Sequence, residues 1–163
     1  MAPANPPLKP ATIELDATDR RLLALLQTDC ALTNDELASR THVSPATSLR
    51  RVRKLVEAGV IERRIAIVSP GAAGGVTAIV EVTLEQQSAE LLDRFEHQVA
   101  AAAEVQQCYR VASGPDFVLV VFVADMAAYH AFAHRVLTAQ ANVRNVRSFF
   151  AVKRSKFEPK VPL

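Results

Sequence analysis

The amino-acid sequence predicts an α+β chain, with a helical first part and a second part that mixes strands with helices. Between residues 15 and 58, apolar side chains recur every three or four positions, as they do on one face of an amphipathic helix. From Val76 to about residue 84, apolar and polar residues alternate instead, which is typical of a half-buried strand. Residues 69–75 lie between the two patterns and are rich in glycine and proline, so we expect a domain boundary there.

The composition is that of a soluble globular protein. Its 163 residues, 50% of them hydrophobic, are enough for two small packed cores. The net charge is only +2, but the charges are unevenly distributed: residues 76–143 hold 3 basic and 8 acidic residues, whereas residues 144–163 hold 6 basic and one acidic. Any attraction to a polyanion must therefore come from local groups of charges.

The sequence shows no long apolar run and no signal peptide, so we expect a cytoplasmic protein with no membrane partner. Cys30 and Cys108 lie far apart and outside any metal-binding spacing, which predicts two buried free thiols in a reducing compartment. Residues 1–12 contain four prolines among alanines, and we interpret them as a disordered arm.

A small helical domain is predicted over residues 13–61. Asp16 is a suitable N-cap for its first helix, and Asp19 adds a negative charge to the first turn. The second helix begins with a capping box formed by Thr33 and Glu36.

The third helix begins with Ser44 as N-cap and Pro45 at the first helical position. Only residues 41–43 separate it from the second helix, and two short helices joined this closely form a helix-turn-helix. In that motif the second helix presents its N-terminal side chains to the major groove of DNA. The candidate DNA contacts are Ser44, Ala46, Thr47, Ser48, Arg50, Arg51 and Lys54.

A basic helix face has a simpler interpretation, because most such faces are only solvated. The helix that precedes this one is what favours double-stranded DNA as the partner. We expect the opposite face to pack into a three-helix core built from Leu15, Leu22, Leu26, Leu37, Leu49, Val52 and Val56.

Residues 62–75 are predicted to link the two domains. Gly59 supplies a left-handed stop after the third helix, and the apolar residues that follow favour an extended segment, either a short wing or a linker strand. Arg63 and Arg64 in this segment are candidates for contacts to DNA phosphates, or equally for a solvated strand edge.

Residues 76–152 have the order strand, helix, strand, strand, helix, strand, with helices starting at Ser88 and Asp125. The strands are expected at residues 76–84, 105–112, 117–124 and 143–152. This order predicts a ferredoxin-like βαββαβ antiparallel sheet with both helices on one face. The other face lacks a cover, so we expect a homodimer that associates through the sheet. Residues 153–163 form a basic C-terminal tail.

This combination resembles the Lrp/AsnC (leucine-responsive regulator) family of transcription factors. The residues that carry the resemblance are Leu15, Asp16, Asp19, Ser44, Pro45, Arg51, Val52, Leu55, Gly59, Val60, Ile61 and the run from Val111 to Phe117. The resemblance implies a sequence-specific transcriptional regulator. The sequence leaves open whether the expected homodimer assembles further to a tetramer or octamer. The resemblance also implies an amino acid or related metabolite as effector, bound at subunit interfaces by the loop of Ser113, Gly114, Pro115 and Asp116.

This loop departs from the family's usual pattern at one position, because Ser113 stands where the family usually has Gly. A free amino acid is zwitterionic, so its site needs an acceptor for the ammonium group and N–H donors for the carboxylate. Asp116 is the candidate acceptor, and the backbone of Ser113 and Gly114 is the candidate donor. The simpler alternative is that the loop is only a hairpin turn.

No constellation in the sequence predicts an enzyme, a cofactor or a metal site. His130 and His134 are four residues apart on a helix, but the segment HAFAH lacks the Glu of a zinc-protease motif, and we expect both to be solvated. The sirohaem decarboxylases resemble this architecture and are the alternative from another functional class. The polar, basic face of the third helix favours the regulator.

Overall fold

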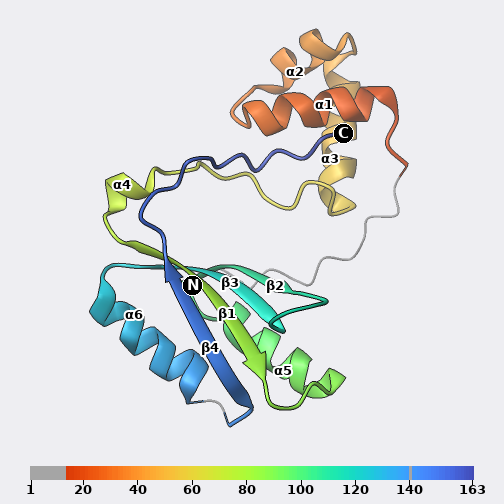
Figure 1. Cartoon of the computed structure of the whole chain (residues 1–163). Helices are drawn as coiled ribbons and strands as arrows, with labels where there is room; N and C mark the ends of the chain where they lie inside the picture. The colour runs from red at the N-terminus through yellow and green to blue at the C-terminus, as the bar shows by residue number, and fades with distance from the viewer. Residues whose placement is uncertain (1–13, 140) are drawn as a thin grey trace. The chain divides into compact units, whose positions relative to one another are not determined.

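The computed structural model describes residues 14–139 and 141–163, so the predicted arm at residues 1–12 lies outside the described residues. The described chain forms two compact units, whose elements are labelled in Figure 1. The head consists of residues 14–67 together with the C-terminal segment 156–163, and the sheet unit consists of the described residues between 68 and 155. No helix in the described ranges is long and apolar enough to cross a membrane.

The head contains three helices, and polar caps define where the first two begin. α1 (Ala17–Thr28) has Asp16 as its N-cap, and the Asp16 carboxylate accepts hydrogen bonds from two backbone N–H groups of the first turn. α2 (Asn34–Thr41) begins with the capping box of Thr33 and Glu36. These side chains satisfy N–H groups that a helix leaves unpaired at its start, as the sequence predicted.

The connection between α2 and α3 (Pro45–Glu57) is short and is fixed by hydrogen bonds. His42 adopts the left-handed conformation with φ of 58°, which ends α2. The side-chain amide of Asn34 donates to the carbonyl oxygen of Pro45 over 2.9 Å and ties the start of α2 to the start of α3. The helix-turn-helix is therefore held by its own backbone and cap contacts.

The head packs around Leu22, Leu37 and Val52, with Leu26 and Ile61 partly buried against them. The predicted core was wrong at Leu49 and Val56, which are 51% and 47% exposed. The buried residues of α3 are instead Ser48, Val52 and Leu55.

The buried face of α3 is thus rotated by about 60° from the face that sequence periodicity indicated, at 100° per residue. The small side chain of Ser48, which is 0% exposed, occupies a buried position where the sequence predicted a polar surface. Leu49 and Val56 line, with Ile61, an open groove of about 500 Å³ between α3 and the segment that follows it.

The segment after α3 is extended but belongs to no sheet of the described chain. Gly59 has φ of +72°, as predicted for the helix stop. Residues 62–69 form no strand, so the first part of the predicted linker, residues 62–75, is an extended segment and not a linker strand. Ile65, Ile67 and Val68 are 55–69% exposed. A four-residue helix, α4 (Pro70–Ala73), was not predicted in the glycine-rich boundary.

The C-terminal segment packs on the head. Gln27 on α1 makes two hydrogen bonds to the backbone of Val161: its amide nitrogen donates to the Val161 carbonyl oxygen over 3.1 Å, and its amide oxygen accepts from the Val161 N–H over 2.7 Å. This contact spans 134 residues of sequence and was not anticipated.

The sheet unit contains four antiparallel strands in the order β2-β3-β1-β4. The strands are β1 (Val76–Leu84), β2 (Val105–Arg110), β3 (Phe117–Val123) and β4 (Val143–Phe150). The helices are α5 (Ala89–Ala100) and α6 (Met126–Phe132), and α6 continues into the π-helical segment η1 (Ala133–Thr138). This is the predicted βαββαβ order, and the strand limits agree within two residues.

One face of the sheet packs against the helices, and the other carries none of the described elements. Every second residue of β1, from Ala78 to Leu84, is buried with Phe95 of α5 and Phe132 of α6. On the opposite, helix-free face, Ile79 pairs with Val120 of β3 on one side and with Phe149 of β4 on the other. The other apolar residues of this face are Tyr109, Val118 and Phe122.

The two cysteines differ from each other in the structure, although the sequence predicted both to be buried. Cys30 is exposed near the start of the loop that follows α1, and Cys108 on β2 is partly buried against the sheet core. Burial raises the pKa of the Cys108 thiol to about 11. Neither forms a disulfide.

Candidate nucleic-acid interface and effector loop

The first turn of α3 is organised by the hydroxyl of Ser44. It accepts the backbone N–H of Thr47 over 3.2 Å and donates to the Thr47 hydroxyl oxygen over 2.9 Å. Ser44 is exposed and Thr47 is partly exposed. The Ser44 bond therefore holds the Thr47 side chain in one orientation at the N-terminal end of the helix, where helix-turn-helix proteins contact base edges.

The outward face of α3 is polar and cationic. Ala46, Arg50 and Lys54 are exposed. Neither Arg50 nor Lys54 forms an ion pair with a described residue. Arg53 is exposed on the same side, about 60° around the helix from Arg50. The sequence prediction omitted Arg53, although its spacing from Arg50 was enough to include it.

The sequence prediction was wrong for Ser48, which it included among the candidate DNA contacts. Its side chain is fully buried, and its hydroxyl has no hydrogen-bond partner among the described residues. A side chain in this position cannot contact a groove of DNA, because it lies on the packed face of α3.

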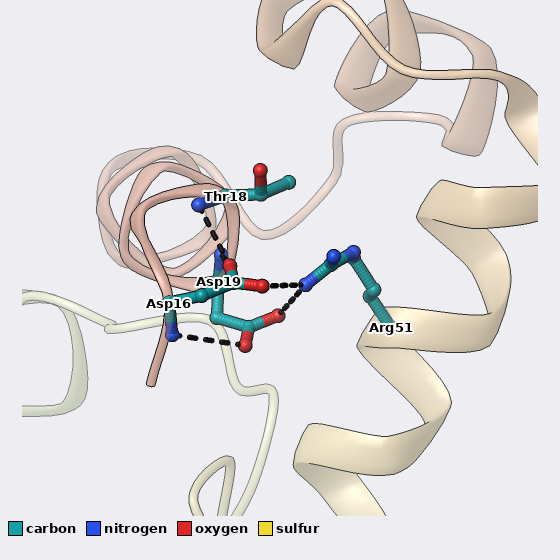
Figure 2. Close-up of polar contacts among 4 residues, drawn as sticks. All are labelled: Asp16, Thr18, Asp19 and Arg51. Carbon is teal, nitrogen blue, oxygen red and sulfur yellow. Dashed lines mark hydrogen bonds and ion pairs between the residues drawn. The ribbon is translucent and has the colours of Figure 1, made fainter. Parts of the chain in front are cut away.

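Arg51 also faces away from the outward surface, and Figure 2 shows its partners. Its Nη1 lies 2.6 Å from a carboxylate oxygen of Asp16 and 2.8 Å from one of Asp19. Both acids belong to the start of α1, and Asp19 is only 5% exposed. We call this arrangement of Asp16, Asp19 and Arg51 the Arg51 bridge.

The electrostatics of the Arg51 bridge follow from these contacts. The backbone N–H of Asp19 and the guanidinium of Arg51 hold the pKa of the Asp16 carboxyl below its ordinary value. The two carboxylates raise the pKa of Arg51 further above its already high value, hydrogen bonding to Asp16 being the larger cause. Both shifts favour the charged forms of Asp16 and Arg51 at neutral pH.

The second candidate site is the loop between β2 and β3. Ser113 and Gly114 are exposed, Pro115 is partly buried, and Gly114 has φ of +89°, a conformation that favours glycine. The backbone N–H groups of Ser113 and Gly114 have no hydrogen-bond partner among the described residues. They are thus free to donate to a ligand.

Asp116 closes the loop against the sheet. Its backbone N–H donates to the carbonyl oxygen of Val82, and its carboxylate Oδ2 accepts the N–H of Leu84 over 2.7 Å. The sequence did not anticipate this structural bond, which uses one oxygen of the candidate ammonium acceptor. The other oxygen, Oδ1, has no hydrogen bond within the described chain.

The remaining candidates from the sequence are the two histidines on the last helical segment. His130 and His134 are exposed on α6 and η1, as expected for solvated side chains. Among the described residues, no group of three or more His, Cys, Asp or Glu side chains is arranged to hold a metal ion.

Comparison with known proteins assigns a family to each half of the chain. Residues 77–161 match the Lrp/AsnC ligand binding domain, and residues 15–62 match a winged helix-turn-helix DNA-binding domain. A helix-turn-helix-type transcriptional regulator of Haemophilus influenzae is 37% identical over 87% of this chain and 85% of its own. The leucine-responsive regulatory protein of Rhizobium meliloti is also 37% identical, over 88% of this chain and 93% of its own.

A solved structure shares the whole architecture. The crystal structure of a transcriptional regulator from Neisseria meningitidis in complex with L-Met superimposes with a TM-score of 0.81 at 31% identity, covering 91% of this chain and 97% of the other. Together with the helix-turn-helix and the βαββαβ sheet described above, these matches show that the chain belongs to the Lrp/AsnC family of DNA-binding transcriptional regulators.

Proposed function

We propose that this regulator contacts DNA through the outward face of α3 and responds to a free amino acid bound at the loop of residues 113–116. The observation that carries the effector site is the pair of exposed, unpartnered N–H groups at Ser113 and Gly114, next to the free Oδ1 of Asp116. A zwitterion needs this combination of donors and a carboxylate. The L-Met complex of the Neisseria meningitidis regulator supports an amino acid as the ligand class.

On α3, the proposed contacts are the side chains that the fold leaves exposed or partly exposed on one side. They are Ser44, Ala46, Thr47, Arg50, Arg53 and Lys54. Thr47 and Arg50 are the candidates for base edges, since a threonine methyl packs on thymine and an arginine binds guanine with two hydrogen bonds. Lys54 and Arg53 lie further along the helix and are the candidates for phosphates, which position the protein without reading sequence. DNA as the ligand is also why we place the protein in the cytoplasm.

We further propose that the protein is a homodimer formed through the helix-free face of the sheet. Ile79, Tyr109 and Phe149 on that face are 44–53% exposed, and burial of exposed apolar area drives association. Two symmetric heads then require two half-sites, spaced by the helical repeat of roughly 10 base pairs or a multiple of it. Tetramers and octamers are further assemblies of that dimer.

The effector proposal is tested with the full chain and two substitutions at one position. Thermal-shift screening of the free amino acids is expected to give one or a few that raise the melting temperature, because a ligand of the folded state stabilises by mass action. Asp116→Asn keeps an oxygen that can accept the Leu84 N–H but removes the charge that the ammonium group needs, so the shift is expected to vanish while the fold persists. An Asp116→Asn variant with an unchanged shift would make the loop only a turn.

Ser113→Gly supplies the matched control for the same screen. It restores the residue usual in the family and keeps the backbone N–H, so binding is expected to persist, with any change confined to which amino acid binds best. The relatives reported above are transcriptional regulators, and nothing among them supports the sirohaem-decarboxylase alternative.

A further inference from the structure

We propose that Arg51 is a positioning residue, which fixes the orientation of α3 on α1 through Asp16 and Asp19 and does not itself contact DNA. The proposal deepens the DNA-binding function, on which it rests. It assigns to Arg51 a role different from the base or phosphate contact that its place in a basic helix suggests.

The first argument is the cost of moving Arg51 away from α1. Asp19 is 5% exposed, and among the described residues Arg51 is the only cationic side chain that pairs with it. A carboxylate that is buried without a partner is strongly unfavourable. The Arg51 Nε is itself buried without a hydrogen-bond partner, so the guanidinium is enclosed on that side as well. Turning Arg51 toward a phosphate would leave Asp19 unpaired.

The second argument is where the Arg51 bridge lies along α3. The start of the helix is tied to α2 by the bond from Asn34 to Pro45, and the middle is tied to α1 by Arg51. Contacts at two separated positions fix both the direction and the rotation of a helix. A helix held at one position can still rotate about that position. Thr47, Arg50 and Lys54 lie within four residues of Arg51, so a rotation released by its loss would displace all three from their contacts.

The two roles predict opposite effects of Asp19→Asn, which removes a negative charge from the head and leaves Arg51 paired with Asp16 alone. If Arg51 contacted a phosphate, Asp19→Asn would tighten DNA binding, because one of the two carboxylates that compete with the phosphate for the guanidinium would be gone. If Arg51 positions α3, Asp19→Asn weakens specific binding although it makes the head more positive. Asp35→Asn, at an exposed acid in the first turn of α2, is the matched control for charge alone.

The experiment uses a duplex selected from a random DNA library by the wild-type protein and a scrambled duplex of equal length. For Arg51→Ala and for Asp19→Asn, we expect affinity for the selected duplex to fall by roughly tenfold each. In the double variant, the loss is expected to be much smaller than the product of the two single losses, because both substitutions break the same contact. Affinity for the scrambled duplex and the slope of log affinity against log salt are expected to change little. For Arg50→Ala, the slope or the preference at one base pair is expected to change instead.

A charge exchange gives the sharpest outcome. In the double variant Asp19→Arg with Arg51→Asp, the bridge is restored with reversed direction, so affinity for the selected duplex is expected to recover above that of Arg51→Asp alone. A phosphate contact predicts the reverse, since the new carboxylate on α3 would repel DNA. Tighter binding by Asp19→Asn, or no recovery in the charge exchange, would overturn the proposal.

A measurement without DNA separates this proposal from the DNA-binding function itself. Residual dipolar couplings of α1 and α3 report the angle between the two helices in the full chain, and we expect the angle to change in Arg51→Ala and to be kept in Arg51→Lys. An unchanged angle in Arg51→Ala refutes the positioning role even if no duplex is selected. Should Arg51→Ala fail to fold by circular dichroism, the Asp19→Asn variant supplies the same comparison.

Discussion

Single residues in this chain have roles that depend on partners far away in sequence. Asp116 is a loop residue by sequence, yet its carboxylate accepts the N–H of Leu84, 32 residues earlier. Ser44 and Thr47, in contrast, satisfy each other within one turn. Contacts between residues far apart in sequence, such as that of Asp116 with Leu84, determine which side-chain atoms remain free to bind a ligand.

The Asp116 contact predicts a difference in stability between two substitutions. Asp116→Ala leaves the partly buried N–H of Leu84 without an acceptor, which costs about 1–3 kcal/mol of unfolding free energy. Asp116→Asn is expected to lose less, because the amide oxygen can accept the same bond. The two tyrosines, Tyr109 and Tyr129, both lie in the sheet unit, so tyrosine fluorescence during urea unfolding measures this unit. Equal stability of the two variants would mean that the bond contributes nothing.

The two thiols are expected to react at very different rates. Cys30 is exposed, whereas burial raises the pKa of Cys108 to about 11 and leaves almost no thiolate at pH 8. A thiol-reactive dye added to the native protein at pH 8 is expected to label Cys30 first. Mass spectrometry of the labelled peptides measures both rates, and the denatured chain, in which both thiols are exposed, is the control. Equal labelling in the native state would contradict the burial of Cys108.

Among the elements, α1 and α2 of the head have carboxylates in their N-terminal caps, Asp16 in α1 and Glu36 in α2. The backbone N–H of Thr33 lowers the pKa of Glu36, and the backbone N–H of Asp19, followed by Arg51, lowers the pKa of Asp16. A carboxyl group whose pKa is lower in the folded state stabilises the fold above its unfolded pKa. That contribution is lost as the pH falls through the lower, folded pKa.

The head is therefore expected to lose stability as the pH falls below about 4.5, the ordinary pKa of Glu36, and further below 3.8, that of Asp16. Urea unfolding followed by circular dichroism at 222 nm, from pH 7 to pH 3, measures the dependence. The double variant Asp16→Asn with Glu36→Gln is expected to be less stable at pH 7 and to depend less on pH in this window. Asp35→Asn is the control, and a pH dependence in the double variant as steep as that of the wild type would refute the assignment.

At the scale of the whole molecule, the helix-free face of the sheet is an apolar surface that the described helices leave uncovered. Phe149, Ile79 and Val120 lie side by side across three strands of this face. Apolar side chains in adjacent positions form a continuous patch, which soluble proteins usually cover by association.

Ile79→Asp is expected to dissociate the proposed dimer, because it places a charge in the centre of the apolar row. Sedimentation velocity measures the mass of the complex, and Val152→Asp, at a fully exposed residue outside the sheet, is the control. Since the head is unaltered, a monomeric Ile79→Asp variant is expected to bind a single half-site weakly. A dimer that survives the substitution would place the interface elsewhere.

The sequence by itself determined the elements of this protein, because the contacts that start and stop them act over a few residues. The caps at Asp16, Thr33 and Ser44, the stop at Gly59 and the order of strands and helices along residues 76–152 all follow from local chemistry and periodicity. The same local information was enough for the family resemblance and for the placement of the loop between β2 and β3.

Only the tertiary structure decided which face of α3 is buried and which basic residues remain available on it. A helix with apolar side chains on more than one side can pack in several rotations, and the choice depends on the neighbouring helices. Here Ser48 packs inward while Leu49 and Val56 stay exposed, and Arg51 pairs with acids 32 and 35 residues earlier. Such pairs are set by how helices meet in space, and no spacing within one helix contains that information.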